Sequence, residues 1–157
     1  MSTDTAALKL GRLPRREHVC KLPKALLDDD AGLLLVDATW GAIQPMTLAP
    51  GVQTIGELEL IEHLRAGLQL IDTRLAEFVD QGTIPGAVAI AHTEIQDHLE
   101  ELDRQRPVAL FCNGPQCAAT PDAVRQLLAA GRPPALILYY RGGMHDWMTL
   151  GLPVELS

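Results

Sequence analysis

The stretch Val108-Ala-Leu-Phe-Cys-Asn-Gly-Pro-Gln-Cys117, followed by Ala118-Ala-Thr-Pro-Asp122, decides the fold. Its first four residues form a continuous apolar run, which predicts a short buried strand. The residues after Cys112 are polar or small and include glycine and proline, which is typical of a loop. Thr120-Pro-Asp122 then offers a capping hydroxyl, a proline at the first helical position and an acidic first turn. A helix is therefore predicted from Thr120 until Gly131.

The alternation of short apolar runs with helical segments extends along the chain. Further strands are predicted over 68–72, 87–91 and 136–140. Helices are predicted over 54–66, with Thr54 as the cap, and over 93–103 on the surface. The apolar stripe of the first helix would comprise Ile55, Leu58, Ile61 and Leu64. Strands of this length between helices favour parallel pairing, so the predicted fold is α/β with an open parallel sheet and helices on both faces.

Composition and charge exclude several classes of function. The chain has 157 residues, of which 47% are hydrophobic and 21% charged, as in a globular protein. Its formal net charge of -7 disfavours direct binding to nucleic acid or to an anionic membrane surface. No apolar run has the length of a signal peptide or of a membrane span, so a cytoplasmic protein is expected. Three cysteines without an export signal do not predict a disulfide framework.

The chain divides into two predicted parts. Residues 1–51 read as a loop-rich N-terminal extension, with several prolines and one expected strand at 33–36. Residues 52–157 carry the regular pattern and form the predicted domain. Ligands of open α/β sheets bind beyond the carboxyl ends of the strands. The segments that leave those ends are Asp72-Thr-Arg74, the loop from Cys112, and Arg141-Gly-Gly143.

These segments form an ordered set of motifs. They are Leu70-Ile-Asp-Thr-Arg74, Gly82-Thr-Ile-Pro-Gly-Ala87, Phe111-Cys112 before a loop and helix, and Arg141-Gly-Gly-Met-His-Asp-Trp147 with Gly151-Leu-Pro153. Together they resemble the rhodanese-like sulfurtransferase family, in particular single-domain bacterial members with a Cys-Asn-Gly-Pro-x-Cys loop. The resemblance runs from Val52 to the C-terminus. It implies a sheet of about five strands and a cysteine at position 112 that carries sulfur as a persulfide.

The residues around Cys112 point to the same chemistry. A thiol between a strand and a helix can face backbone N–H groups and the positive helix end, so we expect a lowered pKa for Cys112. Such a thiolate could take the outer sulfur of a donor and pass it to a thiol or protein acceptor without a cofactor. The predicted active loop comprises Asn113, Gly114, Pro115, Gln116, Cys117 and Ala118.

The loop contains no Lys or Arg, which speaks against thiosulfate as the natural donor. Arg141 is the nearest predicted cation for an anionic donor. Asp72 and Arg74 are expected to pair and to hold neighbouring loops rather than to react. The scattered histidines do not predict a metal site, and the oligomeric state is not indicated.

The sequence bears on three other functions. The dithiol Cys112/Cys117 could sense oxidants by forming a disulfide within the loop. The domain could also be a non-catalytic binding or regulatory module, because fold alone does not decide function. A phosphatase is disfavoured because Ala118 stands where a phosphate-clamping arginine would be needed.

Overall fold

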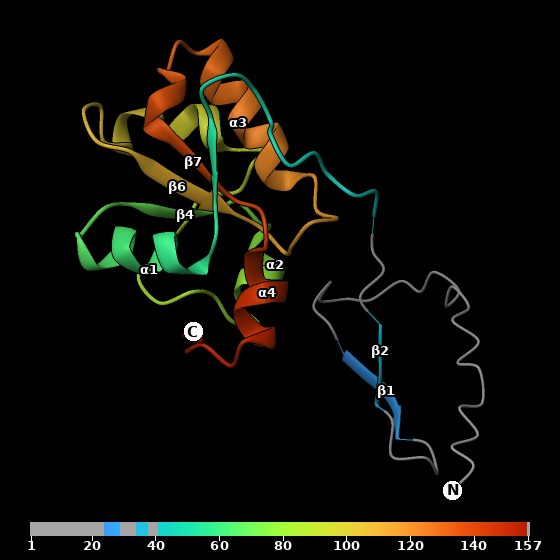
Figure 1. The fold of residues 1–157 in the computed structure, drawn as a ribbon. Coiled ribbons are helices and arrows are strands. Elements are labelled where there is room, and N and C mark those ends of the chain that lie inside the picture. The colour runs from blue at the N-terminus through green and yellow to red at the C-terminus, as the bar shows by residue number, and fades with distance from the viewer. Residues whose placement is uncertain (1–23, 29–33, 38–40, 157) are drawn as a thin grey trace, which may run out of the picture.

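The computed structural model describes residues 24–28, 34–37 and 41–156. Residues 53–140 form a five-stranded parallel sheet in the order β3-β7-β6-β4-β5 (Figure 1). Its strands are β3 (Gln53–Ile55), β4 (Leu70–Asp72), β5 (Val88–Ala89), β6 (Val108–Phe111) and β7 (Ile137–Tyr140). The helices are α1 (Glu57–Arg65), α2 (Ala76–Val79), α3 (Ala119–Ala129) and α4 (Gly143–Thr149), with short 3-10 helices η1 (Ile95–Glu101) and η2 (Pro134–Leu136). The central strand is β6, whose carboxyl end leads into Cys112.

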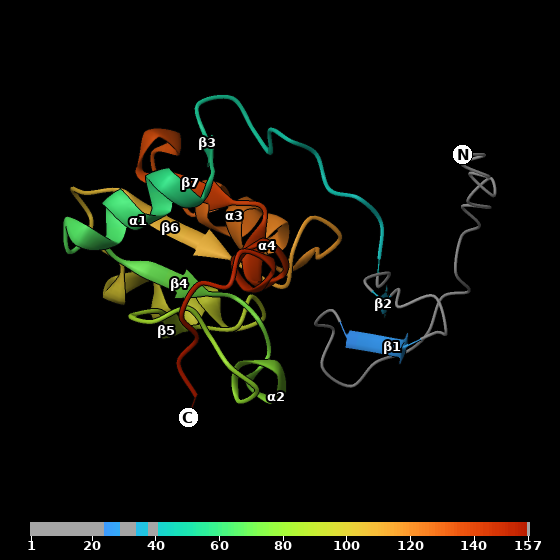
Figure 2. The same ribbon diagram turned by 60° about the horizontal axis from the view of Figure 1, so that its bottom comes forward.

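Helices cover both faces of the sheet, as predicted (Figure 2). Successive residues of a strand point to opposite faces, and the core accordingly divides into two clusters. Val108 and Leu110 pack with residues of α3 and η1. Ala109 and Phe111 pack with residues of α1 and α4 on the other face. This two-sided burial explains why the strand at 108–111 is apolar at every position.

Two predicted helix starts were wrong, and tertiary pairing explains both. Thr54 does not cap a helix, because residues 53–55 pair with β7 as an edge strand, and α1 begins after Gly56. Leu58, expected in the apolar stripe, is 78% exposed, whereas Leu60 is buried. Thr120 does not cap α3 either, since that helix already includes Ala119 and the Thr120 hydroxyl bonds to Thr73.

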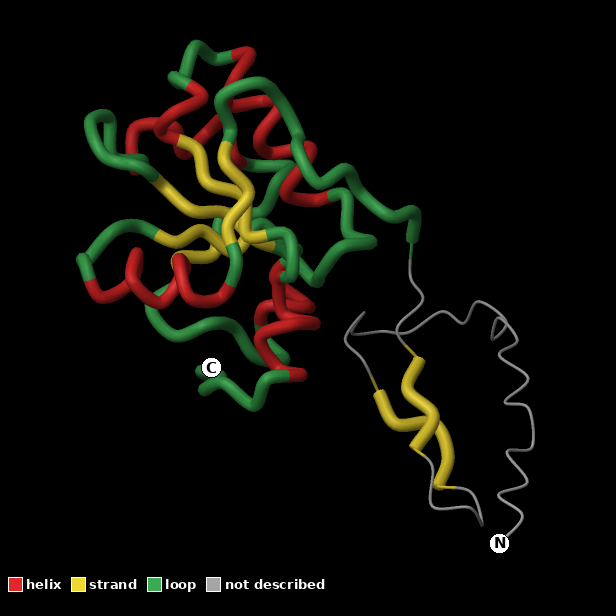
Figure 3. Tube along the Cα trace, viewed as in Figure 1, coloured by secondary structure: helices red, strands yellow, loops and turns green. Residues whose placement is uncertain are grey.

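The other predicted elements of the domain lie close to their predicted positions. The segment predicted as a helix over 93–103 is the 3-10 helix η1, interrupted at His98. Ile95 and Leu102 of this segment are buried, and Leu99 is partly buried against the core. Figure 3 shows the strands of the sheet enclosed between helices, with long loops at the sheet edges. No helix in the described ranges is long and apolar enough to cross a membrane.

The N-terminal part contains more structure than the one predicted strand. β1 (Lys24–Asp28) pairs antiparallel with β2 (Leu34–Asp37), because a lone strand would leave its backbone groups without partners. The boundary predicted at residue 51 stays a prediction. Leu48 and Ala49 nevertheless pack against the core cluster on the α3 face.

Candidate active site at the carboxyl edge of the sheet

Thr73 joins three elements at the carboxyl edge of the sheet. Its backbone N–H and its hydroxyl both donate to the Phe111 carbonyl oxygen, each at 3.0 Å. Its hydroxyl also lies 2.8 Å from that of Thr120 in α3. Its own carbonyl oxygen accepts the N–H of His92 at 2.9 Å. Thr73 therefore brings the segments that carry Cys112, Thr120 and His92 to one place.

Asp72 and Arg74 form a buried ion pair that supports the loops of this edge. Arg74 donates through Nε and Nη2 to the Asp72 carboxylate, at 2.9 Å and 2.7 Å. Its Nη2 also donates to the Gly82 carbonyl oxygen at 2.7 Å, and its Nη1 lies 3.4 Å from Oδ1 of Asn113. The Thr83 hydroxyl donates to Asp72. The pair thus connects the end of β4 to the 82–83 turn and to the loop after β6.

Cys112 lies inside its loop rather than at the surface. The side chain is buried, and Sγ accepts the backbone N–H of Thr120 at 3.4 Å. The thiol lies 3.5 Å from the Cys117 carbonyl oxygen. Burial raises the pKa of Cys112 well above its ordinary value and outweighs the hydrogen bonds from Thr120. The predicted lowering of the Cys112 pKa was therefore wrong, because the contribution of backbone N–H groups is smaller than the effect of desolvation.

The anionic thiol of the loop is Cys117. A hydrogen bond from the Cys112 thiol, backbone N–H groups of Ala119 and Asn113, and the charge of His92 together lower its pKa to about 6, although partial burial opposes this. Cys117 is partly exposed, whereas Cys112 is 2% exposed. The two thiols therefore differ: the pKa of the buried Cys112 is raised, and that of the partly exposed Cys117 is lowered.

Backbone contacts hold the rest of the loop. The Gly114 carbonyl oxygen accepts the N–H of Cys117, and the Pro115 carbonyl oxygen accepts that of Gln44 at 2.7 Å. Gly143 lies directly against the loop with φ of 58°, and a Cβ atom there would collide with the Cys112 carbonyl oxygen and lie 2.8 Å from the Gly114 nitrogen. Only glycine suits that conformation and that spacing.

Arg141 lies apart from the thiols' pocket. Its Nε and Nη2 atoms donate to the Gln44 carbonyl oxygen at 3.1 Å and 2.8 Å. The guanidinium thereby holds the segment that packs against Pro115. Binding of an anionic donor by Arg141 stays a prediction, and the structure gives this side chain a positioning role.

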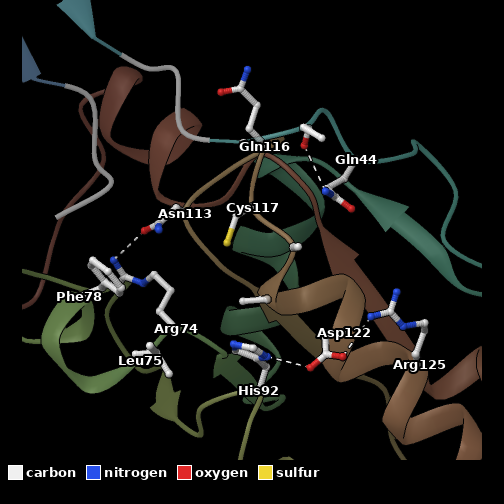
Figure 4. A pocket seen from close by; sticks show the side chains of 14 residues that line it. Gln44, Arg74, Leu75, Phe78, His92, Asn113, Gln116, Cys117, Asp122 and Arg125 are labelled. Carbon is white, nitrogen blue, oxygen red and sulfur yellow. Dashed lines mark hydrogen bonds and ion pairs between the residues drawn. The ribbon is translucent and has the colours of Figure 1, made fainter. Parts of the chain in front are cut away.

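An open pocket of about 630 Å³ lies beside the loop (Figure 4). Of the predicted site residues, Asn113, Gln116, Cys117 and Ala118 line it together with Arg74, whereas Cys112, Gly114, Pro115 and Arg141 do not. Leu75 and Phe78 give the pocket an apolar side. The Cys117 sulfur points from the loop into the space bounded by Arg74 and His92.

Among the pocket residues that sequence reasoning missed are His92 and Asp122. Nδ1 of His92 lies 2.8 Å from Oδ2 of Asp122, which also pairs with Arg125 at 3.0 Å. His92 leaves the carboxyl end of β5, so the rule that singled out the other strand ends would also have found it. Asp122 was interpreted only as an acid in the first turn of a helix. Asp122 contacts His92 only because the fold brings the end of β5 next to the start of α3, although the two residues are 30 positions apart in the sequence.

Comparisons with known proteins agree with this fold. Residues 58–150 match the family model described as Rhodanese-like domain. The chain is 38% identical over 102 residues to the HTH-type transcriptional regulator Rv0324 of Mycobacterium tuberculosis; the match covers 64% of this chain and 44% of that protein. The chain thus spans less than half the length of that relative.

Solved structures show the same architecture at low sequence identity. The BH2092 protein from Bacillus halodurans has a TM-score of 0.59 at 22% identity, over 66% of this chain and 77% of that one. Thiosulfate sulfurtransferase from Pseudomonas aeruginosa has a TM-score of 0.56 at 23% identity, over 67% of this chain and 20% of that one.

Proposed function

The chain belongs to the rhodanese-like domain family, and on this premise we propose that it is a sulfurtransferase that holds sulfane sulfur as a persulfide on Cys112. The observation that carries the proposal is the loop itself, with a buried thiol at the end of the central strand and a second thiol at the adjoining pocket. A persulfide held in a buried loop is shielded from water and from unintended acceptors. The sulfur then passes to a thiol of a small molecule or protein.

An unpaired hydroxyl supports Cys112 as the carrier. Tyr139 is fully buried and its hydroxyl has no hydrogen-bond partner among the described residues. Burial is the main cause of its raised pKa, so it stays protonated. Tyr139 pairs with Leu110, which lies two residues before Cys112. Tyr139 and Leu110 belong to the same core cluster. A buried donor left without a partner is unfavourable unless something accepts from it. The extra sulfur atom on Cys112 would be that acceptor.

The charges of the pocket favour an organic persulfide over thiosulfate as the donor. The loop has no Lys or Arg, and the guanidinium of Arg74 is already bound to Asp72. Arg125, at the rim, is paired with Asp122. A sulfonate would therefore meet no unpaired cation among the described pocket residues. The structural neighbour from Pseudomonas aeruginosa is named for thiosulfate, but the apolar side formed by Leu75 and Phe78 suits an organic group.

Mass spectrometry tests the proposal. The protein is incubated with glutathione persulfide, quenched and fragmented to assign the modified residue. We expect a mass increase of one sulfur atom on Cys112 that cyanide or excess thiol removes, and no increase at position 112 in the Cys112→Ser variant. Wild-type protein that gains no sulfur from any of several sulfane donors would contradict the proposal and favour a binding module.

A second candidate function is a redox-sensing dithiol in a regulatory domain. Two observations favour it. The Cys112 thiol lies 3.5 Å from the carbonyl oxygen of Cys117 in the same loop, and one relative is named as a transcriptional regulator. Mild oxidation would then link the two sulfurs, with loss of two hydrogen atoms. The same mass spectra distinguish this outcome, because a disulfide lowers the mass whereas a persulfide raises it.

A further inference from the structure

We infer that Cys117, His92 and Asp122 form the substrate-facing half of the site. Cys117 takes the sulfur from the donor, His92 protonates the departing thiolate, and Asp122 orients His92. The sulfur then moves to Cys112 in the interior. This inference deepens the proposed function and rests on it.

The pocket places these three side chains around one space. Cys117, His92 and Asp122 all line it, whereas Cys112 does not. The side chains of His92 and Asp122 are 27% and 34% exposed, so a ligand can reach them. A donor molecule that enters this space meets Cys117 first, and Figure 4 shows the His92 ring on the side of the pocket toward which that sulfur points.

His92 is held in one orientation from several sides. Its backbone N–H donates to Thr73, and its carbonyl oxygen accepts Nε2 of Gln126 at 2.8 Å. Gln126 also donates to Oδ2 of Asp122 at 2.8 Å, which fixes the carboxylate that faces Nδ1 of His92. Because Nδ1 faces Asp122, Nε2 is the ring atom left for the substrate. A carboxylate behind an imidazole orients the ring and stabilises its protonated form.

The first step balances with a persulfide donor, R–S–SH. The Cys117 thiolate attacks the outer sulfur, and a new S–S bond forms. The S–S bond of the donor breaks, and its electron pair goes to the inner sulfur as R–S⁻. This thiolate takes the proton from the His92 imidazolium. The products are R–SH, Cys117–S–SH and neutral imidazole, with no change in oxidation state overall.

The second step moves the sulfur inward. The Cys112 sulfur attacks the outer sulfur of Cys117–S–SH, and the S–S bond to Cys117 breaks. The proton of the Cys112 thiol passes to the departing sulfur of Cys117, the residue whose carbonyl oxygen lies 3.5 Å from that thiol. The products are Cys112–S–SH and a Cys117 thiol, which returns to thiolate by giving its proton to the neutral imidazole of His92. A reactive exchange thiol and a protected storage thiol thereby occupy separate positions.

Two donors with different leaving groups test the role of His92. Glutathione persulfide releases an alkyl thiolate, which needs a proton, whereas benzenethiosulfonate releases a sulfinate, which does not. In His92→Gln we expect single-turnover loading from glutathione persulfide to fall roughly 10²-fold, and loading from benzenethiosulfonate to stay within about threefold. A purely structural role would slow both donors equally, and that result would overturn the inference.

His98→Gln is the matched control. His98 also bonds through Nδ1 to a carboxylate, that of Glu101 at 2.9 Å, but it lies on η1 outside the pocket. Both donors should load this variant at the wild-type rate. If wild-type protein takes up sulfur and His92→Gln takes it up at the wild-type rate from both donors, the proposed function stands and this inference fails.

Cysteine variants test the order of transfer. In Cys112→Ser the sulfur should stop on Cys117, since the second step has no acceptor. In Cys117→Ser, loading of Cys112 should fall roughly 10²-fold with both donors, because the exposed nucleophile is gone. Wild-type loading of Cys112 in Cys117→Ser would contradict entry through Cys117 while leaving sulfur transfer itself intact.

Discussion

Nη2 of Arg74 lies 2.7 Å from Oδ2 of Asp72, and the two side chains are 1% and 0% exposed. The pair lies at the end of β4, next to the central strand, and reaches Asn113 in the active loop. Two charges removed from water are tolerated when each is fully hydrogen-bonded by its surroundings. Here Gly82 and Thr83 complete the hydrogen bonding, so the pair links the loops beneath the pocket.

Asp72→Asn should lower the free energy of unfolding by about 3–5 kcal/mol, because the Arg74 charge would stay buried without its partner. Urea denaturation measures the change. Arg65→Ala is the control, since its pair with Glu62 is 72% exposed on both sides. That variant should lose about 0.5 kcal/mol or less. Equal losses in the two variants would contradict the structural role assigned to the buried pair.

Cys117 should react as a thiolate well below the pH at which an ordinary cysteine does. Its pKa is lowered to about 6, so reactivity with iodoacetamide should be complete above that pH and lost as the pH falls through it. Cys112 should stay unreactive because burial raises its pKa. Rates measured by peptide mapping between about pH 5 and about pH 9 check this. Cys112→Ala should move the midpoint upward, since the hydrogen bond from Cys112 is the largest cause of the lowering. A midpoint near the ordinary value of about 8.5 would contradict the assignment.

Gly143→Ala should disturb the active loop as well as the fold. The φ of 58° strains any side chain, and the added methyl group would collide with the loop backbone. We expect a loss of about 2 kcal/mol or more in unfolding free energy and strongly reduced sulfur loading. Gly67→Ala separates the two effects, because Gly67 has φ of 73° with nothing within 4 Å. It should lose about 1 kcal/mol and load sulfur normally.

Tyr139→Phe should stabilise the resting protein and shorten the life of the Cys112 persulfide. Removal of an unpaired buried hydroxyl favours the folded state by about 1 kcal/mol, while the carried sulfur loses its proposed donor. Tyr140→Phe should lower the free energy of unfolding, because the Tyr140 hydroxyl donates a hydrogen bond to Glu57 at 2.9 Å and this bond would be lost. Thermal denaturation and persulfide decay, followed by mass spectrometry, measure both effects. A persulfide that decays equally fast in wild type and Tyr139→Phe would remove Tyr139 from the mechanism.

Arg141→Ala should loosen the segment around Gln44. Without the two bonds to the Gln44 carbonyl oxygen, hydrogen exchange at the Gln44 amide, which donates to Pro115, should accelerate roughly tenfold or more. Arg141→Lys keeps the charge but not the paired geometry and should accelerate exchange as well. Unchanged exchange together with a raised KM for an anionic donor would assign Arg141 to donor binding instead.

Local patterns predicted those elements whose residues are buried along their whole length. β6 was predicted at its observed bounds because a strand covered on both faces is apolar throughout. The short strand β3 was missed because three residues carry little pattern, and its pairing with β7 decides its conformation. Thr120 has the local features of a cap, yet its hydroxyl is more favourably placed against Thr73 in the interior.

The sequence by itself determined the α/β architecture, the loop after the central strand and the presence of two thiols in it, because these follow from the order of apolar runs and turn residues. Only the tertiary structure decided which thiol is charged and which histidine lies near it. The charge of a thiol depends on its desolvation and on neighbouring groups. His92 and Asp122 meet because β5 ends and α3 begins at the same edge of the folded sheet.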